Sequence, residues 1–160
     1  EHLYANAKTM GADLDGIAQQ TPSFFVWAVR DSFTAPLQRV QIIKGYIDGS
    51  GNPQEQVFDV ACSDGGSPDP ESYRCPDNNA KIDISSCAFS QDVGAAELKT
   101  FWSDPTFKAD QRAFYYVRAL ENPTCRWSTW DAIRNNVEPR PDMPKTIQER
   151  VWSSPIHYIP

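Results

Sequence analysis

Apolar residues occupy alternate positions in several short stretches of the chain, which is the pattern of β-strands. The pattern predicts strands over residues 21–31, 37–48, 57–63, 95–103 and 112–121. The stretch 21–31 (TPSFFVWAVRD) is apolar on both sets of alternate positions. We therefore expect this strand to be covered on both faces. For 95–103 and 112–121 a helix is the alternative.

A glycine-rich turn at residues 49–53 (GSGNP) separates two of these strands, which indicates a β-hairpin with a loop longer than two residues. Gly45 interrupts the first arm and marks either a bulge or a close approach of another group to the backbone. In the second arm Asp59 alternates with apolar neighbours, so we expect its face of the strand to be exposed to solvent.

Other parts of the chain are rich in turn-forming residues. Residues 64–79 (DGGSPDPESYRCPDNN) are turn-forming almost throughout. Residues 81–90 could include a short strand. The proline-rich stretch 140–160 is expected to be mostly extended surface chain. Within it, residues 147–152 are predicted to form a helical turn or a short strand.

Residues 128–136 (STWDAIRNN) form the clearest predicted helix. Ser128 is a candidate N-cap, and Asp131 is favourable in the first turn. Several short strands, long turns and one late helix predict a mainly β fold. We expect residues 1–160 to form a single β-sandwich-like domain with long loops and one short helix near the C-terminal third, a length that fits one domain.

The composition argues against two kinds of partner. The formal net charge is −6, from 15 Lys and Arg against 21 Asp and Glu, and no basic cluster is present. Nucleic-acid binding is therefore not expected. No apolar run approaches the roughly 18 residues of a membrane span, so a membrane is not expected as a partner either.

The four cysteines Cys62, Cys75, Cys87 and Cys125 are an even number without the C-x-x-C spacing of zinc sites. They allow three pairings, among which the sequence alone does not choose. The short first separation favours a Cys62–Cys75 bridge, which leaves Cys87 with Cys125. Four free thiols in a cytosolic protein are the alternative. Disulfides persist in oxidising compartments, so we expect a periplasmic or secreted bacterial protein.

Residues suited to catalysis are few. His2 and His157 are the only histidines, and no G-x-S-x-G motif occurs. We therefore predict no catalytic residue and no cofactor. Four aspartates in or near the polar loop are weak calcium candidates, but they lack EF-hand spacing, so no metal site is predicted. These aspartates are Asp64, Asp69, Asp77 and Asp83.

Arginine and tryptophan gather before and within the predicted helix of this acidic chain. A guanidinium over an indole ring is favourable, so the group either binds a carboxylate, covers a neighbouring domain or forms an internal stack. With two aromatic residues nearer the C-terminus it forms our candidate binding or docking surface. The surface comprises Arg126, Trp127, Trp130, Arg134, Trp152 and Tyr158.

The stretches QRAFYYVRALENPTCRWSTWDAIR (111–134) and TIQERVWSSPI (146–156) resemble the C-terminal region of the bacterial family called domain of unknown function 3604. The segments APLQRVQIIKGYID, VFDVACSD and GAAELKTFWSDPTF resemble the same family. The resemblance implies that larger members begin with a metal-binding barrel similar to the polymerase and histidinol phosphatase class. This chain has no H-x-H pair, so no metal ligand or catalytic residue is carried over to it.

The resemblance implies an accessory role. We expect the chain to be the C-terminal fragment of a longer protein, where it scaffolds, covers or helps to bind substrate for a metal-dependent phosphoesterase-like domain. Its expected partner is that N-terminal domain or another copy of the chain. Two alternatives stay open: a stand-alone carbohydrate- or peptide-binding module, which an exposed coplanar row of aromatic rings would favour, and a small metal-dependent hydrolase.

Overall fold

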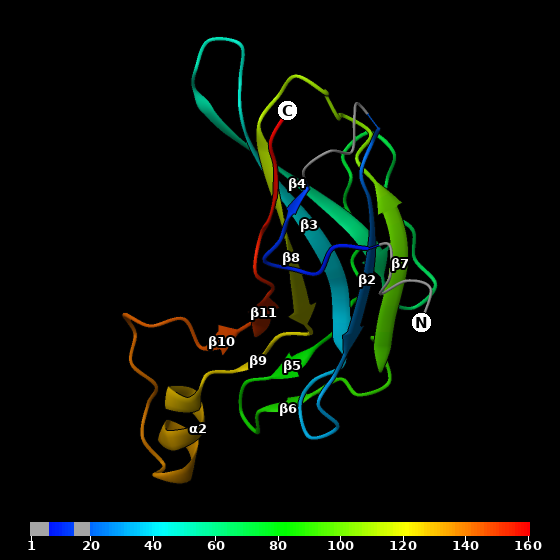
Figure 1. Cartoon of the computed structure of the whole chain (residues 1–160). Helices are drawn as coiled ribbons and strands as arrows, with labels where there is room; N and C mark the ends of the chain where they lie inside the picture. The colour runs from blue at the N-terminus through cyan, green and yellow to red at the C-terminus, as the bar shows by residue number, and fades with distance from the viewer. Residues whose placement is uncertain (1–6, 15–19) are drawn as a thin grey trace.

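Two layers of β-strands of unequal size make up the fold. A computed structural model describes residues 7–14 and 20–160 (Figure 1). In the larger layer the strands follow the order β1–β12–β8–β3–β4, and β11 also pairs with β8. The β1–β12 pair is parallel, and the other pairs of this sheet are antiparallel. The strands are β1 Asp13–Leu14, β3 Leu37–Ile47, β4 Pro53–Cys62, β8 Ala113–Glu121, β11 Arg150–Trp152 and β12 Ile156–Tyr158.

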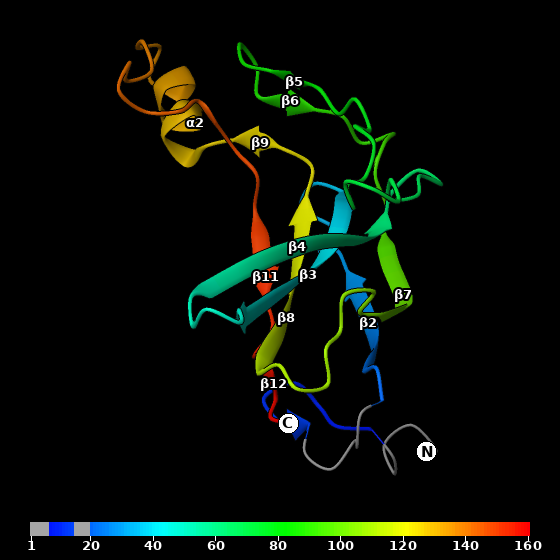
Figure 2. The same ribbon diagram turned by 90° about the horizontal axis from the view of Figure 1, so that it is seen from above.

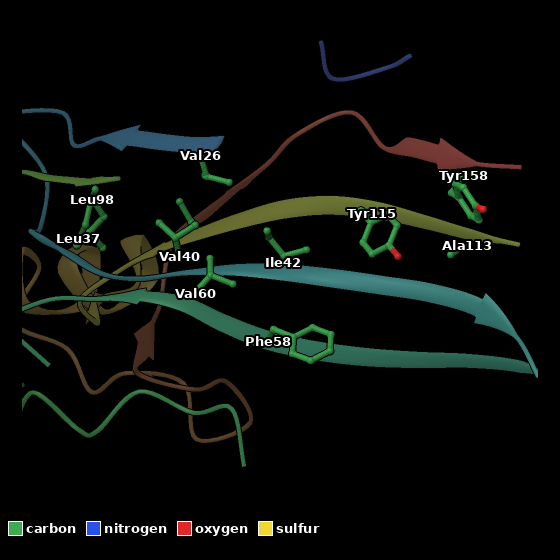
Figure 3. Close-up of a cluster of buried hydrophobic side chains, with 11 residues drawn as sticks. Val26, Leu37, Val40, Ile42, Phe58, Val60, Leu98, Ala113, Tyr115 and Tyr158 are labelled. Atoms are coloured by element: carbon green, nitrogen blue, oxygen red, sulfur yellow. The ribbon is translucent and has the colours of Figure 1, made fainter. Parts of the chain in front are cut away.

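The smaller layer is an antiparallel pair formed by β2 (Ser23–Val29) and β7 (Glu97–Ser103). Figures 1 and 2 show this pair beside the larger sheet. Val26 from β2 and Leu98 from β7 belong to the same buried cluster as side chains from β3, β4 and β8 (Figure 3). The core therefore lies between the two layers, and the mainly β prediction is confirmed.

The strand predicted over 21–31 is present as β2, but the expectation that it is covered on both faces is wrong. Val26 is buried, whereas Phe25, Trp27 and Val29 expose 47%, 60% and 66% of their surface. The smaller layer has only two strands, and none of the described residues packs over its outer face. Three large apolar side chains of β2 therefore face outwards.

The predicted hairpin is confirmed as β3 and β4, with a register shift between Val40 and Gln41. The expectation that Asp59 faces solvent is wrong, because its side chain is fully buried. The backbone N–H of Asp59 donates to the carbonyl of Tyr73 at 2.9 Å, which places the polar loop over this part of β4. The polar loop that follows β4 thus covers the face of β4 that its alternation pattern predicts to be exposed.

The two stretches with a helical alternative are strands, because they form β7 and β8. Residues 140–160 are less peripheral than predicted. In this region β12 extends the large sheet by pairing with β8, and Tyr158 lies opposite Ala113 and is buried. The prediction of a short strand over 147–152 is confirmed in part, because β11 covers residues 150–152.

Small elements surround the two layers. Within the described residues there is one helix, α2, which spans Trp127–Arg134 and begins one residue before the predicted segment. Ser128 lies inside the helix and is not its N-cap, because Arg126 occupies that position without a side-chain capping bond. The remaining short strands form two antiparallel pairs: β5 Ile82–Asp83 with β6 Ala88–Phe89, and β9 Thr124–Cys125 with β10 Thr146–Ile147.

Two disulfides link the loops to this framework. Cys62 is bonded to Cys75 and Cys87 to Cys125, with Cα–Cα separations of 5.6 Å in both. The favoured pairing is therefore the observed one. The first bridge closes the polar loop onto the end of β4, and the second joins the β5–β6 region to β9 immediately before α2.

A buried ion pair fixes the segment that follows β7. The Lys44 ammonium lies 2.6 Å from Asp104, and both side chains are almost completely buried. Asp104 also accepts hydrogen bonds from the Tyr115 hydroxyl and from the Thr106 backbone, both at 2.8 Å. Burial alone would raise the pKa of Asp104, but these hydrogen bonds, led by that from Lys44, lower it overall.

Candidate ligand-binding face

The outer face of the large sheet, turned away from β2 and β7, carries the side chains best suited to bind a ligand. Side chains alternate along β8, so Tyr115 points into the core and its neighbours Phe114 and Tyr116 point to the other side. Arg118 follows on that same side two residues later. On β3, their register partners are Gly45 opposite Phe114, Ile43 opposite Tyr116 and Gln41 opposite Arg118.

Gly45 makes room for an aromatic ring. A Cβ atom at this position would overlap the ring of Phe114, so only glycine lets that ring lie over β3. The close approach that the sequence indicated at Gly45 is thereby confirmed. Phe114 keeps 40% of its surface exposed in this position.

Phe114 and Tyr116 form an aromatic pair on the outer face. Their ring planes are 14° from parallel, and their centroids are 6.3 Å apart. The His157 ring extends this aromatic surface on the other side, with its centroid 6.2 Å from that of Phe114. Phe114 thus has two neighbouring rings, that of Tyr116 along β8 and that of His157 across the β12–β8 pair.

A groove of about 650 Å³ opens beside Phe114. Its lining includes polar groups of both charge signs, namely Glu55, Arg112 and Asp13, together with His157. Nδ1 of His157 lies 3.6 Å from Oδ1 of Asp13, and both side chains are at least half exposed. The groove therefore offers an apolar wall, hydrogen-bond donors and hydrogen-bond acceptors, which is the usual composition of a ligand site.

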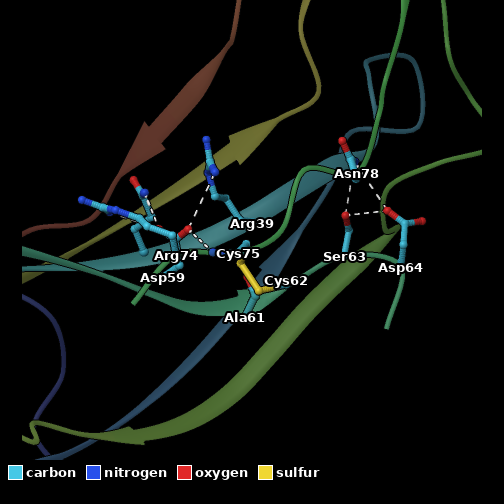
Figure 4. Close-up of a disulfide and its surroundings, with 10 residues drawn as sticks. Arg39, Asp59, Ala61, Cys62, Ser63, Asp64, Arg74, Cys75 and Asn78 are labelled. Atoms are coloured by element: carbon cyan, nitrogen blue, oxygen red, sulfur yellow. Dashed lines mark hydrogen bonds and ion pairs between the residues drawn. A yellow bond between two sulfur atoms is a disulfide. The ribbon is translucent and has the colours of Figure 1, made fainter. Parts of the chain in front are cut away.

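Farther along the same face, two arginines lie beside one buried carboxylate (Figure 4), and a third reaches it through Gln41. Nη1 of Arg74 lies 3.5 Å from Oδ1 of Asp59, and Nη1 of Arg39 lies 3.7 Å from Oδ2. Gln41 connects the third arginine, because it donates to Asp59 at 2.6 Å and accepts from Nε of Arg118 at 2.7 Å. We call Arg39, Arg74 and Arg118 the arginine cluster.

The hydrogen-bonding capacity of Asp59 is met mainly by neutral donors. Besides Gln41, the backbone N–H of Cys75 donates to Asp59 at 2.7 Å, whereas the two guanidinium groups stay at longer ion-pair distances. No hydrogen bond joins the Arg39 side chain to another described residue, and its Nε is buried without a partner among them. A guanidinium has five N–H donors, so much of the donor capacity of Arg39 and Arg74 is unused.

The loop that carries Arg74 is held on both sides of this residue. Tyr73 has a φ of +57°, a conformation that non-glycine residues rarely adopt. Its carbonyl accepts from the Asp59 backbone, and the next residue after Arg74 is Cys75, which is bonded to Cys62. The disulfide and the contacts with Asp59 therefore determine where the Arg74 guanidinium lies, although half of its side chain is exposed.

Trp152 adds an aromatic side chain beside the arginine cluster. It is the register partner of Arg118 across the β11–β8 pair, so its side chain projects from the same face of the sheet. The residue exposes 55% of its surface. Of the residues named from the sequence as a candidate surface, Trp152 is the one that the register places on the outer face.

The other members of that predicted surface lie elsewhere. Trp127 and Trp130 belong to α2, which stands away from the two layers (Figures 1 and 2), and they expose 74% and 37% of their surface. The Arg134 guanidinium lies 5.5 Å from the Trp130 ring centroid, as in the stack considered above. Tyr158 is buried, and its hydroxyl donates to the Ala109 carbonyl, so it is not available on the surface. Docking through the exposed members stays a prediction.

The four calcium candidates do not converge. Asp64 accepts from the Gly94 backbone, and the others accept from nearby backbone N–H groups within their own turns. Hydrogen bonds from Ser85 and Ser86 lower the pKa of Asp83 to about 2. Within residues 7–14 and 20–160, no three His, Cys, Asp or Glu side chains are grouped so that they could hold a metal ion. The four candidates are Asp64, Asp69, Asp77 and Asp83, of which the last three accept within their own turns.

The sequence did not reveal the arginine cluster, because its members come from β3, the polar loop and β8, and only the strand register brings them together. The usable signals were the close approach indicated at Gly45 and the alternate Phe114, Tyr116 and Arg118 on β8. No spacing rule connects either signal to Arg74.

Fold and site together define a mainly β, disulfide-linked domain with an aromatic and arginine-rich outer face. The whole chain, residues 1–160, matches the family described as "Protein of unknown function (DUF3604)". The chain belongs to this family, as the resemblance of its sequence indicated. No curated protein and no solved structure matches it significantly. Among the described residues, no helix has the length and apolar character needed to cross a bilayer.

Proposed function

We propose that this chain is an accessory domain that binds a carbohydrate on its outer face and thereby holds substrate for a catalytic domain of the same polypeptide. The observation that supports this proposal is the nearly parallel Phe114–Tyr116 pair. A sugar ring has apolar C–H faces and a polar rim, and an exposed aromatic ring offers a matching apolar surface. Two such rings on one strand offer contacts to successive parts of an oligosaccharide.

The polar groups of the groove suit the rim of a sugar. Carboxylate oxygens of Glu55 and Asp13 accept hydrogen bonds from hydroxyl groups, and the Arg112 guanidinium donates to them. His157, beside Phe114, adds a further ring nitrogen. A groove with one apolar wall and a few convergent polar groups fixes the orientation of a small ligand.

Gly45→Ala provides the sharpest test of the aromatic pair. The new Cβ atom requires the Phe114 ring to move from its place over β3, but that ring is the free end of a side chain, so the fold is retained. We expect both Gly45→Ala and Phe114→Ala to weaken oligosaccharide binding about tenfold, roughly the 1.4 kcal/mol that an aromatic contact contributes. Isothermal titration against a panel of neutral and acidic oligosaccharides measures the loss.

Phe33→Ala is the matched control, because Phe33 exposes 94% of its surface in the loop between β2 and β3 and lies outside the outer face. We expect this variant to bind like the unmodified chain. The proposal is wrong if no oligosaccharide of the panel binds, or if Phe114→Ala and Gly45→Ala bind all of them unchanged.

A second candidate function, association with another copy of the chain, is favoured by the outer face of β2 and β7. Phe101 exposes 68% of its surface and contacts Phe25 with ring centroids 4.8 Å apart, beside the exposed Trp27. Large contiguous apolar patches mark interaction sites. Glu97 and Lys99 neutralise one another on this face at 2.9 Å, so two identical faces can approach without net repulsion.

The proposal also includes the cellular compartment in which the protein works. Two disulfides support a protein that works where thiols are oxidised, such as the bacterial periplasm or the cell exterior. Extracellular carbohydrate is accessible to an accessory domain in either place. Intact mass measured with and without reduction tests this step, because two bridges add about 4 Da on reduction.

A further inference from the structure

The arginine cluster carries more positive charge than its surroundings neutralise. Within the described part of the chain, its ion pairs involve one carboxylate, that of Asp59, although the chain as a whole has a net charge of −6. We infer that the carbohydrate is acidic and that its oxyanion, a carboxylate or a sulfate, is held by Arg39 and Arg74. This inference rests on the proposed carbohydrate-binding function and adds the class of ligand.

The donors needed for such a group are present and unused. The Arg74 side chain makes one hydrogen bond with a described residue, at the long distance of 3.5 Å, and the Arg39 side chain makes none. Guanidinium groups bind carboxylates and sulfates through pairs of parallel N–H donors. Both arginines therefore retain the donor pairs that an incoming oxyanion requires.

The cluster is also prearranged. Asp59 is fixed by Gln41 and by the Cys75 backbone, so it holds one guanidinium group near each of its two oxygens without using their donors fully. Figure 4 shows Arg39 and Arg74 approaching Asp59 from different sides. Because the arginines are already positioned, a ligand loses less free energy in ordering them on binding.

The distance to the aromatic pair fits one ligand that uses both regions. Arg118 follows Tyr116 by two positions and Phe114 by four on the same face of β8, which corresponds to about 7 Å and about 13 Å at roughly 3.3 Å per residue. Trp152 lies beside Arg118 in the neighbouring strand. An oligosaccharide along β8 would place its rings on the aromatic side chains and an acidic substituent at the arginines.

Four probes test the inference by isothermal titration with the full chain. They are an oligogalacturonate, the same oligomer with its carboxylates methyl-esterified, a sulfated galactan oligomer and a poly-glutamate peptide. The ester removes the charge while it preserves the sugar rings, and the peptide offers charge without sugar. The sulfated oligomer distinguishes sulfate from carboxylate as the source of the oxyanion.

We expect an acidic oligosaccharide to bind at least tenfold more tightly than the ester, because hydrogen bonds between charged groups are stronger than those between neutral groups. Arg74→Gln should remove this preference and leave binding of the ester unchanged, and Arg74→Lys should restore it in part. Arg39→Gln should act in the same way. Arg140→Gln is the control, because Arg140 pairs with Asp142 on an exposed loop outside the face.

Arg74 is half exposed, so its variants should fold, and near-ultraviolet circular dichroism verifies this. The inference is overturned if the acid and its ester bind equally, or if Arg74→Gln binds the acid unchanged. It is also overturned if poly-glutamate binds as tightly as the acidic sugars and independently of Phe114. If Phe114→Ala still weakens binding of the esterified oligomer in these cases, the proposed carbohydrate-binding function stands. If no oligosaccharide binds at all, both the proposed function and this inference are overturned.

Discussion

Single residues determine the outer face through two kinds of constraint. At position 45 the constraint is space, because the absence of a side chain lets the Phe114 ring cross to the neighbouring strand. At position 59 it is charge, because a carboxylate inside the protein requires donors and countercharges. Gln41 and the Cys75 backbone supply the donors, and the countercharges are Arg39 and Arg74, which form the candidate oxyanion site.

The buried Lys44–Asp104 pair leads to a prediction about stability at the residue scale. Asp104→Asn would leave the Lys44 ammonium buried without its countercharge, so we expect the free energy of unfolding at pH 7 to fall by roughly 3–5 kcal/mol. Urea denaturation followed by circular dichroism measures the change. Asp142→Asn, which alters an exposed pair screened by solvent, should leave stability nearly unchanged.

The same pair gives a pH dependence. The pKa of Asp104 is lowered in the folded chain, so the folded state binds this proton less readily than the unfolded state does. The stabilisation is complete above the unfolded pKa near 3.8 and is lost as the pH falls through the lower folded value. The difference in free energy of unfolding between the unmodified chain and Asp104→Asn should therefore become smaller below about pH 4. A difference that stays constant down to the pH of acid unfolding contradicts this prediction.

At the scale of elements, the two disulfides have different consequences. Replacing Cys62 and Cys75 by alanine should lower stability by about 3 kcal/mol, and replacing Cys87 and Cys125 by about 4 kcal/mol, since the second loop is longer. Only the first pair holds the loop with Arg74. We therefore expect only the first double variant to lose its preference for acidic over esterified oligosaccharide.

Thermal unfolding and titration of both double variants separate the two effects. The Cys87/Cys125 variant is the control, because it loses stability without altering the arginine cluster. If the Cys62/Cys75 variant keeps the preference for the acidic ligand, the disulfide does not position Arg74.

Elements with a strong local pattern were predictable. The hairpin of β3 and β4 and the strand β8 follow from alternation and turn residues, and the short first cysteine separation favours the observed pairing. Other features depend on contacts across the chain. Tyr158 is in the core because β12 pairs with β8, and Asp59 is buried because the polar loop covers it. No local pattern contains this information.

At the scale of the whole molecule, the narrow second layer leaves an apolar face exposed. In the isolated chain we expect this face to cause self-association that increases with concentration, because burying Trp27 and Phe101 removes apolar surface from water. Trp27→Thr with Phe101→Thr should keep the chain monomeric at concentrations where the unmodified chain dimerises. Sedimentation velocity measures the difference.

Phe33→Thr again serves as the control, since it removes an exposed aromatic side chain outside the face. Self-association that persists unchanged in the double threonine variant would assign the contact to another surface. Arg74 lies at the outer face of the larger sheet and should not contribute to self-association, so Arg74→Gln should associate like the unmodified chain.

The covalent closure of the polar loop has a consequence for the life of the protein in a cell. Before the Cys62–Cys75 bond forms, as under reducing conditions, only non-covalent contacts with Asp59 hold the loop of Arg74 to the sheet. On the proposed function, the binding face is complete only once these two thiols are oxidised. Recognition of the proposed acidic ligand would then depend on the formation of this one bond.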